Sequence, residues 1–292
     1  PGLIALALCT FIPAGLSIYI SFTNYSLIHL QDWGWVGLAN YERIFTGLLQ
    51  GDFWRVLVWT FAWAFLSTLL SFLIGLFLAL ILNDKRIVES NIYRTILILP
   101  WALPSTITIL AWAGLFSTSF GPINRLIISL GGEAVPWLTE PGWARLTCLF
   151  VNLWIAFPFM MAACLGALQS VPAELYDAAH VDGAGKFQTF RFITLPLLRM
   201  AVVPLLVAGF AMQFSNFSVI FLMTNGGPFV DASAVAGATD LLATYMYRVA
   251  FASTMNDYGI AAANGMLLFL IVGTITVINA KFTGAFKQAD EL

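Results

Sequence analysis

Six long stretches of the chain contain no Asp, Glu, Lys or Arg and are rich in apolar residues. A helix rises about 1.5 Å per residue, so each stretch is long enough to cross about 30 Å of hydrocarbon. Because lipid offers no partner for backbone polar groups, such stretches are expected to be helical. The pattern predicts an all-α, polytopic membrane helix bundle that forms one transmembrane domain over residues 1–292. The six transmembrane helices are expected at approximately 2–22, 56–82, 95–116, 146–168, 200–222 and 259–280.

Composition supports this assignment and excludes several other classes. Hydrophobic residues make up 60% of the chain and charged residues 10%, against about 25% charged residues in soluble domains. The net charge of −2 argues against a nucleic-acid partner, which would require clustered Lys and Arg. Cys9, Cys148 and Cys164 lie in apolar stretches, and His29 and His180 are far apart. We therefore expect no metal site and no catalytic residues. Since Pro1 begins directly in an apolar stretch, we expect that native N-terminal residues precede it, and a further helix or a short cytoplasmic tail upstream stays open.

The distribution of Lys and Arg over the connections predicts an orientation. Cytoplasmic connections of membrane proteins are enriched in these residues. The connections 83–94, 169–199 and 281–292 hold eight Lys and Arg in 55 residues. The connections 23–55, 117–145 and 223–258 hold five in 98 residues. The first set is predicted to be cytoplasmic.

One of the cytoplasmic connections, residues 170–196, is much longer than a link between two membrane helices requires. Its sequence is SVPAELYDAAHVDGAGKFQTFRFITLP. Pro172 suits the first turn of a short helix, and Gly183 and Gly185 are expected to end it. A second helix is predicted from about Lys186 to Thr194, before the next membrane helix. We interpret the segment as a docking element for a partner outside the membrane.

The segment does not itself bind a nucleotide. Gly185 and Lys186 resemble part of a phosphate-binding loop, but GxxxxGK[ST] would require Gly at 180 and Ser or Thr at 187. The chain has His180 and Phe187 there. We therefore expect no ATPase activity and no cofactor in this chain.

The membrane stretches carry neutral hydrogen-bonding groups among aromatic rings. Hydroxyl groups of a neutral sugar require donors and acceptors, while its C–H faces rest on rings. The alternative is that these groups join helices to one another, at about 0.6 kcal/mol each. No charged residue lies well inside a stretch, which argues against a secondary transporter. The polar residues are Ser105, Thr106, Asn152, Gln213, Ser215, Asn216 and Asn264, and the aromatic residues are Trp101, Trp112, Trp154, Phe157, Phe159, Phe214 and Phe217.

The stretch ELYDAAHVDGAGKFQTFRFITLP resembles the EAA loop of the membrane subunits of binding-protein-dependent ABC importers, EAAxxDGAxxxxxFxxIxLP. Tyr176 and Asp177 depart from the small residues of that pattern. The resemblance implies the type I ABC importer permease fold in a bacterial or archaeal cytoplasmic (inner) membrane. It also implies a coupling helix that docks on an ATPase subunit. The coupling residues would be Glu174, Ala178, Asp182, Gly183, Ala184, Phe187 and Phe190.

The same resemblance implies a set of partners. These are a second homologous permease subunit, two ATPase subunits that bind ATP and Mg, an external sugar-binding protein, an oligosaccharide substrate and the lipid bilayer. Catalysis would belong to the ATPase subunits, so the chain itself would not be an enzyme.

Over nearly its whole length the chain is similar to one branch of this family, the larger membrane subunits of maltose/maltodextrin importers. Stretches such as LILPWALPSTITILAWAGLF, FGPINRLI and VNLWIAFPFMM carry the similarity. Ala156, Phe159 and Gln213 depart from the best-known member, which leaves the exact sugar open. Trehalose and glycerol phosphate stay alternatives, although a phosphorylated solute would require a cation in the cavity. The implied substrate-binding positions are Trp101, Ser105, Asn152, Ile155, Ala156, Phe159, Gln213 and Asn216.

Overall fold

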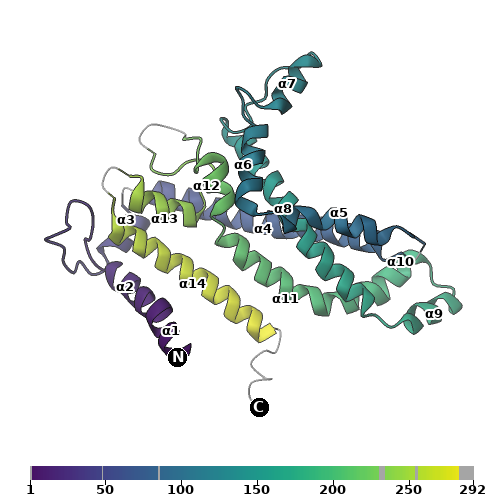
Figure 1. Ribbon diagram of the computed structural model, residues 1–292. Coiled ribbons are helices and arrows are strands. Elements are labelled where there is room, and N and C mark those ends of the chain that lie inside the picture. Colours follow the sequence, from purple (N-terminus) through teal and green to yellow (C-terminus); the bar gives the residue numbers. More distant parts are fainter. Residues whose placement is uncertain (1, 48, 85, 230–233, 254–255, 283–292) are drawn as a thin grey trace. The chain divides into compact units, whose positions relative to one another are not determined.

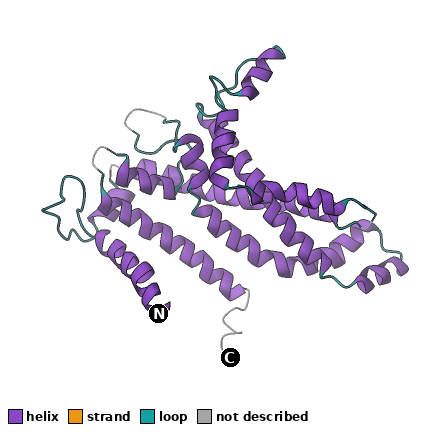
Figure 2. Ribbon diagram, viewed as in Figure 1, coloured by secondary structure: helices purple, strands orange, loops and turns teal. Residues whose placement is uncertain are grey.

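The computed structural model describes residues 2–47, 49–84, 86–229, 234–253 and 256–282 (Figure 1). Within these ranges every element of regular structure is a helix, and one isolated bridge joins Thr23 to Trp35 (Figure 2). The predicted all-α class is therefore confirmed. Lys85 and Lys287, which were counted in the predicted cytoplasmic connections, lie outside the described residues.

Four helices of the described chain are long and apolar enough to cross a membrane. They are α4 (Gln50–Leu82), α8 (Pro141–Gln169), the continuous helix Lys186–Phe214 that ends with α11 (Leu195–Phe214), and α14 (Tyr258–Phe282). A fifth span is a bent pair, α5 (Ser90–Ala102) and α6 (Ser105–Leu115), which meet at 89°. The first predicted span is helical but short, and consists of α1 (Gly2–Leu6), a π-helical turn (Ala7–Phe11) and α2 (Ile12–Ile20).

Two of these spans differ from the predicted windows. Pro104 has no backbone N–H and disfavours a helical residue before it, and Leu103 accordingly takes an extended conformation that divides the third window. The fifth window, 200–222, is displaced. Its helix begins at Lys186 and passes through Arg191 and Arg199, which the charge-free window had excluded. It ends at Phe214, and α12 (Ser218–Thr224) is a separate helix.

The chain divides into two compact units, each made of three segments of sequence. One unit contains residues 1–63, 110–148 and 214–274, and the other contains residues 64–109, 149–213 and 275–292. We call them the first unit and the second unit. That residues 1–292 form one transmembrane domain stays a prediction.

In the second unit, apolar side chains from three helices form a core. Leu76, Ala79 and Leu82 of α4 pack with Met161, Cys164, Leu165 and Leu168 of α8 and with Leu198 and Val202 of α11. Gly75 permits the close approach of α4 and α8, because a Cβ atom at this position would lie 2.6 Å from the backbone nitrogen of Met161. The same unit contains α9 (Ala173–Val181), α10 (Lys186–Thr189) and the π-helical turn Phe190–Thr194.

In the first unit, polar contacts hold the connection between α12 and α13 (Leu242–Phe251). The buried Asp240 forms an ion pair with Arg248 at 3.0 Å and accepts a hydrogen bond from the backbone N–H of Gly237. Asp52, near the start of α4, accepts hydrogen bonds from the backbone N–H groups of Val235 and Ala236. These contacts tie the connection to α4. The same unit contains α1, α2, α3 (Ala39–Phe45), α7 (Pro122–Ser129) and most of α14.

Candidate transport and coupling sites

Four of the predicted substrate-binding residues lie on α8 at helical spacing. Asn152, Ala156 and Phe159 follow one another at i, i+4 and i+7, and Ile155 lies beside them. Residues at this spacing share one face of a helix. The Asn152 side chain is buried, Ile155 and Ala156 are half-buried, and Phe159 is 43% exposed. This face of α8 therefore runs from a buried amide to an exposed aromatic ring.

A direct hydrogen bond joins two of the predicted polar residues. The Asn152 side-chain amide donates to the Gln213 amide oxygen at 3.2 Å, and so links α8 to the end of α11. Both side chains are amides, which carry donors as well as acceptors. Both residues belong to the predicted substrate-binding set, although they are 61 positions apart in the sequence.

Two aromatic residues of the predicted set also meet within the second unit. The Trp101 and Phe159 ring centroids lie 6.2 Å apart with an interplanar angle of 43°. Trp101 lies one residue before the end of α5, and Ser105 begins α6 just after the break at Leu103 and Pro104. Trp101 is 58% exposed, so its ring offers an open apolar face beside the break.

Seven of the eight predicted substrate-binding residues belong to the second unit, since each of their positions falls in 64–109 or 149–213. Asn216 belongs to the first unit and lies between α11 and α12. The contact of Asn216 with the other seven residues stays a prediction.

The coupling segment forms a short helix with a defined C-terminus. After α9, the backbone N–H of Ala184 donates to the carbonyl of Ala179 at 2.9 Å, and the N–H of Gly183 donates to the carbonyl of His180 at 3.1 Å. These two bonds are those of a Schellman motif, which places the residue after the C-cap in the left-handed region. Gly183 has φ +74° as the motif requires. Asp182 is the C-cap residue.

Contacts within the segment fix the orientation of α9. The buried Ala179 faces inward, while Glu174, Ala178 and Asp182 are exposed. The hydroxyl groups of Tyr176 and Thr194 lie 3.3 Å apart, which joins α9 to the π-helical turn. Tyr176, a departure from the small residues of the motif, is thus used in an internal contact.

Beyond Gly183, the chain turns directly into the long helix of the fifth span. The backbone N–H of Gly185 donates to the side-chain oxygen of Gln188 at 2.8 Å, which caps the start of α10. The helix predicted from about Lys186 to Thr194 is confirmed, but it does not end before the membrane helix, because α10 and the π-helical turn continue into α11. Phe187 is 76% exposed and Phe190 is half-buried.

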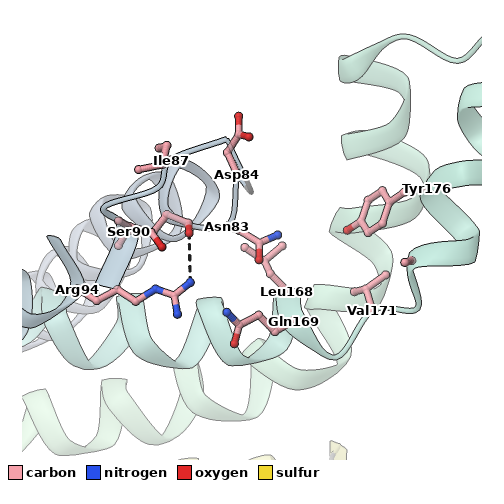
Figure 3. A pocket seen from close by; sticks show the side chains of 11 residues that line it. Asn83, Asp84, Ile87, Ser90, Arg94, Leu168, Gln169, Val171 and Tyr176 are labelled. Atoms are coloured by element: carbon pink, nitrogen blue, oxygen red, sulfur yellow. Dashed lines mark hydrogen bonds between the residues drawn. The ribbon is translucent and has the colours of Figure 1, made fainter. Parts of the chain in front are cut away.

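A cavity of about 580 Å³ lies beside α9 in the second unit (Figure 3). Its lining includes Asn83, Arg94, Gln169 and Tyr176, and Arg94 donates to the backbone carbonyl of Leu82 at 3.2 Å. Sequence reasoning missed this cavity. Arg94 had entered only the charge count, and no pattern in the sequence indicates that it approaches the end of α8.

At the rim of this cavity, Asp84 is paired with Arg86. The hydrogen bonds donated by Arg86 hold the pKa of the Asp84 carboxyl well below its usual range. The carboxylate is therefore charged at neutral pH. Across the described ranges, no group of three or more His, Cys, Asp or Glu side chains is placed to hold a metal ion.

Comparison with known proteins assigns the chain to a family. Residues 71–282 match the family described as "Binding-protein-dependent transport system inner membrane component". The chain belongs to this family. The matched range contains the coupling segment and every predicted substrate-binding residue. The chain is therefore a multi-pass component of the inner membrane.

Similar curated proteins are permease subunits of sugar transport systems. The chain is 39% identical over 295 residues to the galactooligosaccharides transport system permease protein GanP of Bacillus subtilis, covering 99% of this chain and 69% of GanP. It is 43% identical over 251 residues to the maltose/maltodextrin transport system permease protein MalF of Salmonella typhimurium, covering 85% of this chain. The chain spans about half, 49%, of the length of that MalF protein.

Solved structures confirm the fold. A bacterial ABC transporter involved in the import of the acidic polysaccharide alginate aligns with a TM-score of 0.76 and 24% identity, over 98% of this chain and 93% of that chain. An amino acid ABC transporter aligns with a TM-score of 0.53 and 14% identity, over 85% of this chain and 96% of that chain. At these identities the likeness concerns the fold alone, and that fold is the ABC importer permease fold expected from the coupling motif.

Proposed function

We propose that the chain is the permease subunit of an ATP-driven importer for neutral oligosaccharides of the maltose/maltodextrin type. The observation that carries the proposal is the hydrogen-bonded Asn152 and Gln213 pair, on the same unit as the exposed Trp101 and Phe159 rings. Amides bind sugar hydroxyl groups, and rings support the apolar faces of the sugar. The proposed contacts are Trp101, Ser105, Asn152, Ile155, Ala156, Phe159, Gln213 and Asn216.

In this proposal the chain pairs with a second homologous permease subunit. Two ATPase subunits dock from the cytoplasm on the coupling segment, and an external binding protein delivers the sugar. Closure of the ATPase dimer moves α9 through Glu174, Ala178, Asp182, Gly183, Ala184, Phe187 and Phe190. The Tyr176 to Thr194 contact and the helix that continues through α11 then carry the displacement toward Gln213. ATP and Mg are bound by the partner subunits, and this chain performs no catalysis.

A second candidate substrate is a galactooligosaccharide. It is favoured by the similarity to GanP, which extends over 99% of this chain. Maltodextrins and galactooligosaccharides both present hydroxyl groups and apolar ring faces, so the same residue types suit either. The two differ in the positions of their hydroxyl groups, and Gln213 and Ala156 are the residues to which we assign that discrimination.

The assembled transporter, reconstituted with its binding protein, tests the proposal. Sugar-stimulated ATP hydrolysis is measured with maltotriose, a galactooligosaccharide, trehalose and glycerol phosphate. We expect stimulation by the neutral oligosaccharides and none by glycerol phosphate, because the proposed contact residues include no Lys or Arg. Stimulation by glycerol phosphate alone would overturn the assignment of a neutral sugar.

A further inference from the structure

A second cavity, of about 440 Å³, lies in the first unit, and none of its lining residues belongs to the proposed sugar or coupling sites. It is lined by Trp54, Arg55, Val58, Trp59, Ala62 and Arg145. Residues 54, 58 and 62 follow one another at i, i+4 and i+8 on α4, while Arg145 comes from the start of α8. The cavity therefore has an apolar wall along one helix and a guanidinium group from each of the two helices.

The charges at this cavity do not balance. Arg55 donates to the Asp52 carboxylate at 2.8 Å and to the backbone carbonyl of Ala236 at 2.7 Å. Arg145 donates through Nε to the backbone carbonyl of Ala238 at 2.8 Å, and no carboxylate of the described residues pairs with it. Two cations thus share one carboxylate, which leaves a net positive charge that an anion would neutralise.

Both guanidinium groups are held in place. The Arg145 guanidinium carbon lies 4.6 Å from the centroid of the Trp59 ring. The Trp59 indole N–H donates to the carbonyl of Thr239 at 3.3 Å. The Nε atom of Arg55 is buried and has no hydrogen-bond partner in the described structure. A stacked cation and a buried donor without a partner are both ready to receive an acceptor oxygen.

The position of the cavity along the membrane normal indicates which anion it would bind. Arg55 and Arg145 are the residues directly before the charge-free stretches 56–82 and 146–168. They therefore lie where the hydrocarbon ends and the lipid headgroups begin. From Arg55 to Ala62 the helix rises about 10 Å into the apolar layer. Val58, between them, is 67% exposed.

We propose that this cavity binds the phosphate of an anionic phospholipid headgroup, held by Arg55 and Arg145, with an acyl chain along Val58 and Ala62. Trp54 and Trp59 are the aromatic residues that favour this interface. Under the predicted orientation the lipid belongs to the outer leaflet. The proposal does not depend on which sugar the transporter carries.

A matched pair at position 58 tests the proposal in the assembled, purified transporter. The valine side chain at position 58 has no hydrogen-bonding group to lose, and Val58→Glu and Val58→Gln differ from each other chiefly in charge. The glutamate either repels the phosphate or pairs with the arginines in its place. Native mass spectrometry measures retention of short-chain phosphatidylglycerol, with phosphatidylcholine as the zwitterionic comparison. We expect phosphatidylglycerol to bind about tenfold more weakly to Val58→Glu than to Val58→Gln.

Arg145→Gln should also weaken phosphatidylglycerol binding, while Arg125→Gln, an exposed arginine on α7 outside the cavity, should not. Thermal unfolding of each variant shows whether Arg145→Gln still folds, and the position 58 pair decides the question if it does not. Equal retention of phosphatidylglycerol by Val58→Glu and Val58→Gln would overturn the proposal. Inorganic phosphate that binds as tightly as phosphatidylglycerol and displaces it would also overturn it, in favour of a free-anion site.

Discussion

Gly183 offers the sharpest test of the coupling segment. Its φ of +74° is required by the two Schellman hydrogen bonds at the end of α9, while a Cβ atom at this position would meet nothing within 4 Å. Gly183→Ala would therefore introduce backbone strain without a steric clash. A left-handed conformation costs a residue with a side chain about 1–2 kcal/mol, which corresponds to about a 5- to 30-fold shift away from the native turn.

Gly185→Ala is the matched control, two residues along the same segment. Gly185 has φ −72°, which alanine adopts freely, and its added Cβ would meet only Gln188 Oε1, at 3.8 Å. Asn tolerates the left-handed region better than Ala, so Gly183→Asn should recover part of the loss.

The assay is sugar-stimulated ATP hydrolysis by the transporter reconstituted with its ATPase subunits and binding protein. We expect Gly183→Ala to reduce the stimulated rate by up to the factor given by the strain, Gly185→Ala to leave it near that of the native protein, and Gly183→Asn to lie between them. Equal rates for Gly183→Ala and Gly185→Ala would refute the reasoning that the turn geometry at Gly183 supports coupling.

Three further outcomes follow from individual contacts. Gly75→Ala should lower the midpoint of thermal unfolding, at a cost of about 1–3 kcal/mol, because its Cβ would lie 2.6 Å from the Met161 nitrogen. Gly166→Ala should leave the midpoint unchanged, because its Cβ would meet nothing within 4 Å. Equal midpoints for the two variants would contradict this. Asn152→Leu should reduce sugar uptake about tenfold or more, because it removes the contact with Gln213 and a hydrogen-bond donor to the sugar. Unchanged uptake would show that Asn152 is not part of the substrate-binding site. The lowered pKa of Asp84 contributes stability that is present above the ordinary value of 3.8 and is lost as pH falls toward the folded-state pKa. The stability difference between the native protein and Asp84→Asn, followed by thermal unfolding, should therefore be constant from about pH 5 to 8 and shrink in more acidic solution. A difference that grows on acidification would contradict the lowered pKa of Asp84.

The apolar pattern predicted the helical class and the main spans because charge exclusion acts on every residue of a membrane helix. It failed where local backbone chemistry decides the course of the chain. At Pro104 the helix predicted from the third window is divided into two helices that meet at 89°. The absence of charged residues does not indicate such a bend. Arg191 and Arg199 lie on a helix that runs on from the coupling segment, so counting charges placed the beginning of that helix too late.

The candidate sites divide in the same way. The helical spacing of Asn152, Ala156 and Phe159 is visible in the sequence, because it depends on one helix alone. The glycines of the coupling segment likewise predicted a turn at Gly183, and the structure adds the hydrogen bonds that explain its conformation. The hydrogen bond from Arg145 to the carbonyl of Ala238, 93 positions away, depends on tertiary packing, and no local sequence pattern predicts it.

The central claim is that Asn152 and Gln213 contact a neutral oligosaccharide that ATP hydrolysis moves across the membrane. Uptake of radiolabelled maltotriose into vesicles that contain the complete transporter, its binding protein and ATP tests this claim most directly. We predict ATP-dependent accumulation by the native protein, and loss of accumulation in the Asn152→Leu, Gln213→Leu double variant while the complex stays assembled. Undiminished accumulation by an assembled double variant would contradict the account.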